Sequence, residues 1–143
     1  MAKVLIVYWS GTGNTEIMAE KIAEGLKSAN QDVDLRQVSD VLASEVKDFD
    51  KIALGCPSMG AEVLEEDEFQ PFFDEAINHL NGKKIALFGS YGWGDGEWMR
   101  NWVSECETAG ANIYTNEGLM INETPDSLGE EECVEFGKGF ADF

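Results

Sequence analysis

The chain has 143 residues, of which 43% are hydrophobic, and its 28 acidic and 10 basic residues give a net charge of −18. This length suits one domain with a substantial core, and the apolar content argues against an intrinsically disordered chain. The negative charge repels nucleic acid and acidic membranes, which argues against both as partners, and it attracts basic proteins. The same charge also keeps the protein soluble, and this role is compatible with the attraction of basic proteins.

The longest apolar runs are strand-length, far short of the ~20 residues that a membrane-spanning helix needs, and no secretory signal is visible. The three cysteines, Cys56, Cys106 and Cys133, are odd in number and lack C-x-x-C spacing, which predicts reduced thiols in a cytoplasmic protein. His79 is the one histidine, so neither a metal site nor a Ser-His-Asp arrangement is expected.

Strand and helix patterns alternate along the chain. We predict strands at residues 3–9, 33–38, 51–56, 83–89 and 112–121, helices at 15–28, 69–80, 97–109 and 127–141, and a short amphipathic piece at 41–46. Polar and apolar residues alternate in 33–38, which indicates an edge strand. The order predicts an α/β fold, with a doubly wound, five-stranded parallel sheet and helices on both faces, as a single domain over residues 1–143.

The first predicted strand ends in a loop of small polar residues and glycines: Ser10, Gly11, Thr12, Gly13, Asn14 and Thr15. A strand, a short polar loop and a helix aim free backbone N–H groups at one point, where the helix dipole favours a phosphate. The loop has no lysine, so it does not match G-x-x-x-x-G-K-[ST], the phosphate-binding pattern of nucleotide hydrolases. It also has only part of G-x-G-x-x-G, the pattern of dinucleotide-binding folds. It predicts a monophosphate held by neutral donors, with an ordinary capped turn as the alternative.

Two further loops follow predicted strands. Residues 57–62 contain Met59 and Gly60, and residues 89–96 place Trp93 among four glycines, where folding alone rarely uses tryptophan. Ligands of doubly wound sheets lie beyond the carboxyl ends of the strands, so we expect the three loops to converge. Trp98 and Trp102, four residues apart in a helical pattern, are expected in the core.

Three motifs carry a resemblance that covers the whole chain: YWSGTGNTE from Tyr8, GCPSMGAE from Gly55 and LFGSYGWGDGEWM from Leu87. Together they resemble the FMN loops of short-chain flavodoxins of anaerobic bacteria. The resemblance implies a sheet of order 2-1-3-4-5, with FMN bound at the point where the strand order reverses. It also implies a low-potential carrier that shuttles single electrons in place of ferredoxin, with no catalytic residue of its own.

The resemblance also implies roles for single residues. Met59 and Trp93 cover the two faces of the isoalloxazine, Glu62 accepts a hydrogen bond from flavin N3–H, and the Gly60–Ala61 peptide turns over when the flavin gains its first electron. The phosphate contacts are expected from Ser10, Thr12, Asn14, Thr15 and Ser90 and from the N–H groups of Gly11 and Gly13. The backbones of Gly92 and Gly94 reach the pyrimidine edge, Asn122 lies near the ribityl chain, and Pro57, Ser58 and Tyr91 complete the predicted set.

Two residues depart from the resemblance. Pro57 stands where relatives often have Ser or Thr, and Ala61 where they often have a polar residue, so one phosphate hydroxyl is missing and the redox potentials can differ. The alternative function is an FMN-dependent quinone or NAD(P)H reductase on the same scaffold. Because no nicotinamide pocket or dimer-forming insertion is visible, we favour a monomeric carrier that docks basic donor and acceptor proteins.

Overall fold

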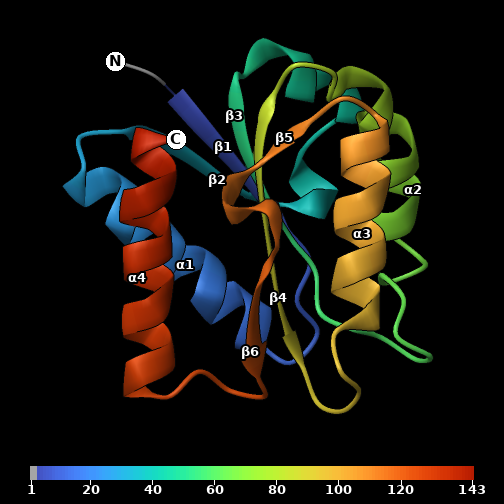
Figure 1. Cartoon of the computed structure of the whole chain (residues 1–143), viewed down its shortest axis with the longest axis vertical. Helices are drawn as coiled ribbons and strands as arrows, with labels where there is room; N and C mark the ends of the chain where they lie inside the picture. The colour runs from blue at the N-terminus through green and yellow to red at the C-terminus, as the bar shows by residue number, and fades with distance from the viewer. Residues whose placement is uncertain (1–2) are drawn as a thin grey trace.

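The computed structural model describes residues 3–143. Helical segments separate the parallel strands along the chain (Figure 1). The strands are β1 (Lys3–Tyr8), β2 (Asp32–Gln37), β3 (Lys51–Gly55), β4 (Lys84–Tyr91), β5 (Asn112–Ile113) and β6 (Leu119–Asn122). The α-helices are α1 (Asn14–Ser28), α2 (Phe69–Ala76), α3 (Glu97–Thr108) and α4 (Ser127–Asp142).

The sheet has the order β2-β1-β3-β4-β5, and every named strand pair is parallel. This arrangement confirms the predicted doubly wound sheet and places β2 at its edge. The strand order reverses between β1 and β3, so the loops that follow these two strands flank the switch point.

The predicted continuous strand over residues 112–121 is wrong. Two short strands occupy that position: β5 pairs with the start of β4, and β6 pairs with its end. Between them Thr115 and Asn116 both have φ of 63°, a left-handed conformation that breaks the ladder. The predicted amphipathic piece at 41–46 overlaps the 3₁₀ helix Ala43–Asp48, which buries Ala43 and Val46 and exposes Ser44, and a further 3₁₀ helix covers Val38–Asp40.

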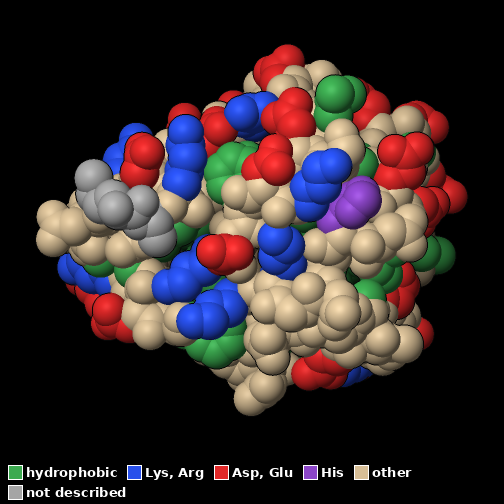
Figure 2. All heavy atoms as spheres, turned by 90° about the horizontal axis from the view of Figure 1, so that it is seen from above, with side chains coloured by type: hydrophobic (Ala, Val, Ile, Leu, Met, Phe, Trp, Pro, Cys, Tyr) green, Lys and Arg blue, Asp and Glu red, His purple; other side chains and the backbone are tan. Residues whose placement is uncertain are grey.

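Lysines gather at the edge of the sheet where the strands begin (Figure 2). Lys3, Lys51 and Lys84 begin β1, β3 and β4. The Nζ atom of Lys51 donates to the carbonyls of Phe140 and Ala141 at the end of α4 (3.2 and 2.6 Å). A cation there offsets the negative end of the helix dipole. Lys51 therefore has a structural role, and all three lysines lie at the end opposite the strands' carboxyl ends.

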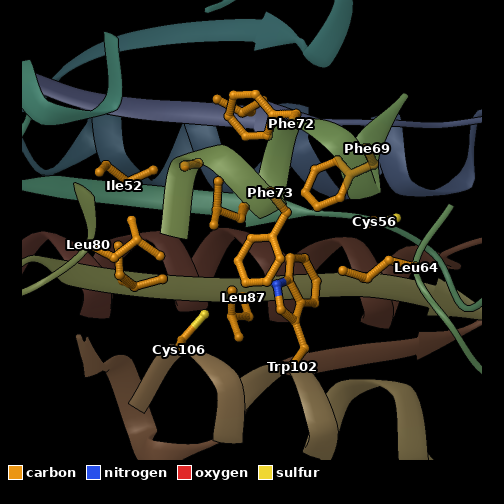
Figure 3. Packing of buried hydrophobic residues seen from close by; sticks show 14 of the residues in the cluster. Ile52, Cys56, Leu64, Phe69, Phe72, Phe73, Leu80, Leu87, Trp102 and Cys106 are labelled. Atoms are coloured by element: carbon orange, nitrogen blue, oxygen red, sulfur yellow. The ribbon is translucent and has the colours of Figure 1, made fainter. Parts of the chain in front are cut away.

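Both faces of the sheet are buried, because successive strand side chains alternate between two cores. Val4 and Ile6 of β1 pack with α1 and α4, whereas Leu5 and Val7 pack with α2 and α3. In the second core the ring of Trp102 meets that of Phe69 edge-on at 5.5 Å between centroids (Figure 3). Trp98 and Trp102 are both buried, which confirms their predicted place in the core.

Helices α1 and α4 lie side by side in backbone contact. A Cβ atom on Gly25 of α1 would stand 2.0 Å from the Val134 carbonyl oxygen, and one on Gly137 of α4 would stand 2.3 Å from that of Ile22. Both distances are far too short for any side chain. The two glycines therefore set the spacing of the helix layer that covers this face.

Candidate functional site

A cavity of about 410 Å³ opens at the carboxyl ends of the strands. Its walls come from the loops after β1, β3 and β4 and from the segment after β6, so the three predicted loops do converge. The lining residues are Trp9, Gly11, Thr12, Asn14, Pro57, Ser58, Met59, Ser90, Tyr91, Gly92, Glu123 and Thr124. Its volume falls in the range of small-molecule and cofactor pockets.

The hydroxyl of Ser10 orders the loop before α1 by accepting two backbone hydrogen bonds. The N–H groups of Gly13 and Glu16 donate to Oγ of Ser10, at 3.1 and 3.2 Å. Among residues 3–143 no acceptor is found for the N–H groups of Thr12, Asn14 and Thr15. Unpartnered donors at a helix N-terminus, next to the positive end of its dipole, form a site for an anion.

Gly11 and Trp9 face each other in this loop. A Cβ atom on Gly11 would lie 2.9 Å from the Trp9 ring, so the ring already fills the place of a side chain. The indole Nε1 of Trp9 donates to Oε1 of Glu68 at 3.2 Å, which fixes the ring. The loop backbone is therefore exposed to the cavity on one side and backed by an aromatic ring on the other.

Hydrogen bonds join the loops, and one of them, between Ser90 and Thr15, is buried. The N–H of Ser90 donates to Oγ1 of Thr15 at 3.3 Å, and Oγ of Ser90 donates to the carbonyl of Glu123 at 2.8 Å. Next to these contacts, the hydroxyl of Thr124 donates to Oδ1 of Asn14 at 2.9 Å. These contacts hold the loops after β1, β4 and β6 in one arrangement.

The loop after β3 is a closed hairpin. Met59 and Val63 exchange two backbone hydrogen bonds (2.9 and 3.0 Å), and Gly60 between them has φ of 49°. Oε1 of Glu62 accepts from the N–H groups of Gly96 and Glu97, at 3.2 and 3.0 Å. Glu62 thus ties this hairpin to the first residues of α3, and among residues 3–143 its Oε2 has no donor.

Half of the predicted residues lie outside the cavity wall itself. Ser10, Gly13 and Thr15 make hydrogen bonds that order the first loop and do not line the cavity. Trp93 projects outward, with 65% of its surface exposed. The amide of Asn122 donates to the Tyr91 carbonyl at 3.2 Å and supports the third loop. The remaining members, Gly60, Ala61, Glu62 and Gly94, belong to the hairpin and to the loop beside it.

Three lining residues were missed by the sequence reasoning: Trp9, Glu123 and Thr124. Trp9 is visible as the last residue of the first apolar run, and its position beside Ser10 could have suggested the role. Glu123 and Thr124 carry no local signal, because the split of the last strand is what brings them to this wall.

The cavity wall contains no Lys, Arg or His, and Glu123 is its one charged residue. Beneath the wall, burial raises the pKa of the Cys56 thiol to about 12, so this group is neutral. An anionic phosphate here would be held by N–H groups and hydroxyls, and Met59 and Tyr91 on the wall offer apolar surface to a planar ring. The donor set therefore fits a flavin mononucleotide.

Within residues 3–143 no group of three or more His, Cys, Asp or Glu side chains is placed to hold a metal ion. In the same part of the chain, no helix combines the length and the apolar composition needed to cross a bilayer.

The fold and the cavity define a doubly wound α/β protein that binds its cofactor at the switch point. A family model described as flavodoxin matches residues 6–137. The flavodoxin of Clostridium beijerinckii is 50% identical over 136 residues, covering 95% of this chain and 97% of that one. The flavodoxin of Megasphaera elsdenii is 46% identical over 138 residues, covering 96% and 98%.

A solved structure agrees. The solution structure of two-electron reduced Megasphaera elsdenii flavodoxin superposes with a TM-score of 0.87, at 46% identity, and covers 98% of this chain and 99% of that one. The chain belongs to the flavodoxin family. It is an FMN-binding electron-transfer protein and not an enzyme, which confirms the predicted cofactor and function and disfavours the reductase alternative.

Proposed function

We propose that the cavity binds FMN with the phosphate at the start of α1. The observation that carries this proposal is the set of N–H groups of Thr12, Asn14 and Thr15, which have no acceptor within residues 3–143, beside a wall without cations. The phosphate would be held there by these donors, by the N–H of Gly11 and by the hydroxyls of Ser10, Thr12 and Thr15, with the Asn14 amide. The Gly13 N–H and the Ser90 hydroxyl proton already bond Ser10 and Glu123, so these two expected contacts are left out.

The flavin ring extends from that point toward the hairpin after β3. Met59 covers its inner face and Trp93 its outer face, while Oε2 of Glu62 accepts from flavin N3–H. Support for this role of Glu62 is that its Oε1 is already held by two N–H groups, which orients the carboxylate. The backbones of Gly92 and Gly94 bond the pyrimidine edge, Asn122 lies near the ribityl chain, and Pro57, Ser58 and Tyr91 complete the wall.

FMN supplies the one-electron chemistry, and the chain tunes it. The Gly60–Ala61 peptide lies at the exposed tip of the hairpin whose ends are fixed by the Met59–Val63 bonds, so it can rotate without unpairing the rest. A further negative charge beside Glu123 and Glu68 is disfavoured, because no cation lines the cavity. The protein therefore runs at low potential and substitutes for a ferredoxin.

The partners are basic redox proteins that supply and take up the electrons. In support, five of the ten basic residues lie at the end remote from the cavity, and Figure 2 views the molecule from that end. They are Lys3, Lys47, Lys51, Lys83 and Lys84. We also propose that residues 1–143 act as one domain and one monomer. The three cysteines are all buried free thiols, which supports a cytoplasmic location.

An anaerobic titration with dithionite tests the proposal. The purified protein is loaded with FMN, unbound FMN is removed, and visible spectra are followed as reductant is added. We expect one FMN per chain and reduction in two resolved one-electron steps. A single two-electron step, or a protein that retains no FMN, would contradict the proposal. Steady-state NAD(P)H oxidation without an added reductase should stay at background.

A further inference from the structure

The side-chain amide of Asn14 is held in one orientation by a residue far away in the sequence. The segment after β6 runs past the first turn of α1, and there the hydroxyl of Thr124 donates to Oδ1 of Asn14 at 2.9 Å (Figure 1). Both residues line the cavity. The oxygen and the nitrogen of an amide point in different directions, so this bond turns the two Nδ2 protons of Asn14 away from Thr124. Within residues 3–143 these two protons have no acceptor.

The orientation of this amide matters because of where it lies. Asn14 is the first residue of α1, next to the unpartnered N–H groups of Thr12 and Thr15. An amide oxygen turned toward an anion repels it, whereas the NH2 group adds two neutral donors. The cavity wall has no Lys, Arg or His that could offset a wrongly turned oxygen. A single amide therefore has more influence here than in a site with a cation.

Thr124 is itself fixed by the chain on both sides of it. The N–H of Glu123 donates to the Tyr91 carbonyl at 2.7 Å, and the Glu123 carbonyl accepts from Oγ of Ser90 at 2.8 Å. Pro125 follows, and the residue before a proline is restricted to extended backbone. Threonine is also β-branched, which limits its rotamers. The Thr124 hydroxyl is therefore held in place before any ligand binds.

The hydroxyl of Thr124 has one proton, and Asn14 accepts it. Thr124 therefore has no proton left for a phosphate and acts on the ligand through Asn14. Its effect is confined to the phosphate end of the cavity. FMN and riboflavin share the ring and the ribityl chain and differ in the phosphate, so this effect should separate the two ligands.

We propose that Thr124 is a positioning residue, which directs the Nδ2 protons of Asn14 to the FMN phosphate and thereby raises the preference of the cavity for FMN over riboflavin. This role rests on the proposed binding of the FMN phosphate at the start of α1. Thr124 makes no contact with the phosphate and takes part in no covalent or redox step.

A double-mutant cycle on the two side chains tests the proposal. The full chain is freed of flavin, and the dissociation constants of FMN and riboflavin are measured by the quenching of flavin fluorescence. The variants are Thr124→Val, Asn14→Ala and the two changes combined. Thr124→Ser keeps the hydroxyl. The matched control is Thr115→Val, which removes a hydroxyl bond to the Glu117 carbonyl (2.9 Å) at an exposed residue outside the cavity wall.

We expect Thr124→Val to weaken FMN binding about threefold to tenfold, which is the net effect of losing one hydrogen bond. Riboflavin binding should change by less than about twofold, because no phosphate is present to sense the amide. Thr124→Ser and Thr115→Val should bind both ligands nearly as the parent does. In the Asn14→Ala background, adding Thr124→Val should weaken FMN binding by less than about twofold, because no amide remains to be positioned.

The outcomes distinguish this role from FMN binding itself. If Thr124→Val or Asn14→Ala binds FMN as tightly as the parent, the positioning role is wrong and FMN binding stands. The same conclusion follows if Thr124→Val weakens both flavins equally, or weakens FMN equally with and without Asn14. If the parent retains no FMN, the proposed function fails and the role of Thr124 with it. Urea unfolding checks that each variant is folded, and the FMN cycle alone decides where riboflavin binds too weakly to measure.

Discussion

Thr15 and Ser90, 75 residues apart, are joined by a buried hydrogen bond in which the Ser90 N–H donates to the Thr15 hydroxyl at 3.3 Å. A hydroxyl can accept one hydrogen bond and donate another. Thr15 can therefore brace the third loop and still donate to the FMN phosphate. This single side chain links the phosphate end of the site to the ring end.

Replacing Thr15 by Val keeps the shape and removes the hydroxyl. The Thr15 hydrogen bond to the phosphate is then lost, and a hydrogen bond to a charged group is worth about 1.5–3 kcal/mol. We expect FMN to bind roughly 10-fold to 150-fold more weakly, because each 1.4 kcal/mol is tenfold. Thr15→Ser is the control and should bind FMN nearly as the parent does. Equal affinities for the Val and Ser variants, measured by fluorescence titration, would show that the hydroxyl has no role.

Gly60 has φ of 49° at the tip of the hairpin, with open space around its Cβ position. A β-branched residue in this conformation is strained by roughly 1–2 kcal/mol. Where the positive φ belongs to the conformation that the peptide adopts with the reduced flavin and not to the one it leaves, Gly60→Val should lower the potential of the first electron by about 40–80 mV.

Gly82→Val is the matched control for this prediction. Gly82 has φ of 79° and also has open space around its Cβ position, but it lies outside the cavity wall. Both variants should lose similar stability, and only the change at Gly60 should move the potential in a spectroelectrochemical titration. An unmoved first potential in Gly60→Val would rule out strain at this peptide as a tuning device.

Glu65 is a buried carboxylate that accepts hydrogen bonds from the N–H groups at the start of α2. Its oxygens accept from the N–H groups of Asp67, Glu68 and Phe69 at 2.9, 2.8 and 2.8 Å. Burial acts to raise the pKa of Glu65, but the three N–H donors outweigh it and hold the pKa below its usual 4.5. The carboxylate therefore stabilises the fold above about pH 4.5, and this contribution is lost as the pH falls through the lowered pKa.

Glu65→Gln should accordingly reduce the free energy of unfolding at pH 7 by about 1–3 kcal/mol. The reason is that the Gln side chain has one uncharged acceptor oxygen where the carboxylate has two charged ones. Its stability should also fall less steeply than that of the parent as the pH drops below about 5. The neighbouring exposed Glu66→Gln is the control. Urea unfolding at several pH values checks the prediction, and parallel pH profiles for the parent and Glu65→Gln would refute it.

Gly137 lies where α4 touches α1. In an open helix, alanine is preferred over glycine by about 1 kcal/mol, so Gly137→Ala would stabilise the chain there. Here the added Cβ would stand 2.3 Å from the Ile22 carbonyl oxygen, and backbone cannot yield as a side chain does. We expect overpacking to prevail, with a net loss of about 1–3 kcal/mol in thermal unfolding. The adjacent exposed Lys138→Ala should be nearly neutral, and a more stable Gly137→Ala protein would show that the helices separate freely.

The sequence by itself determined the layered α/β fold and the three loops of the site. Each sheet face is built from a local pattern, since apolar runs such as 4–7 and 52–54 are buried on both sides, and a local pattern can be read without knowing the fold. Ser10–Thr15 and the glycine-rich residues 89–96 are likewise continuous segments whose chemistry is visible in the chain. The parallel order then brings their ends to one edge.

Only the tertiary structure decided how those segments are joined. The break at Thr115 and Asn116, which splits the last strand, follows from left-handed backbone conformations and from the packing of Tyr114 on Phe136 and Phe140. That break places Glu123 and Thr124 on the cavity wall. The bonds from Ser90 to Thr15 and from Thr124 to Asn14 span the chain, and contacts between residues so distant in sequence leave no local pattern from which they could be read.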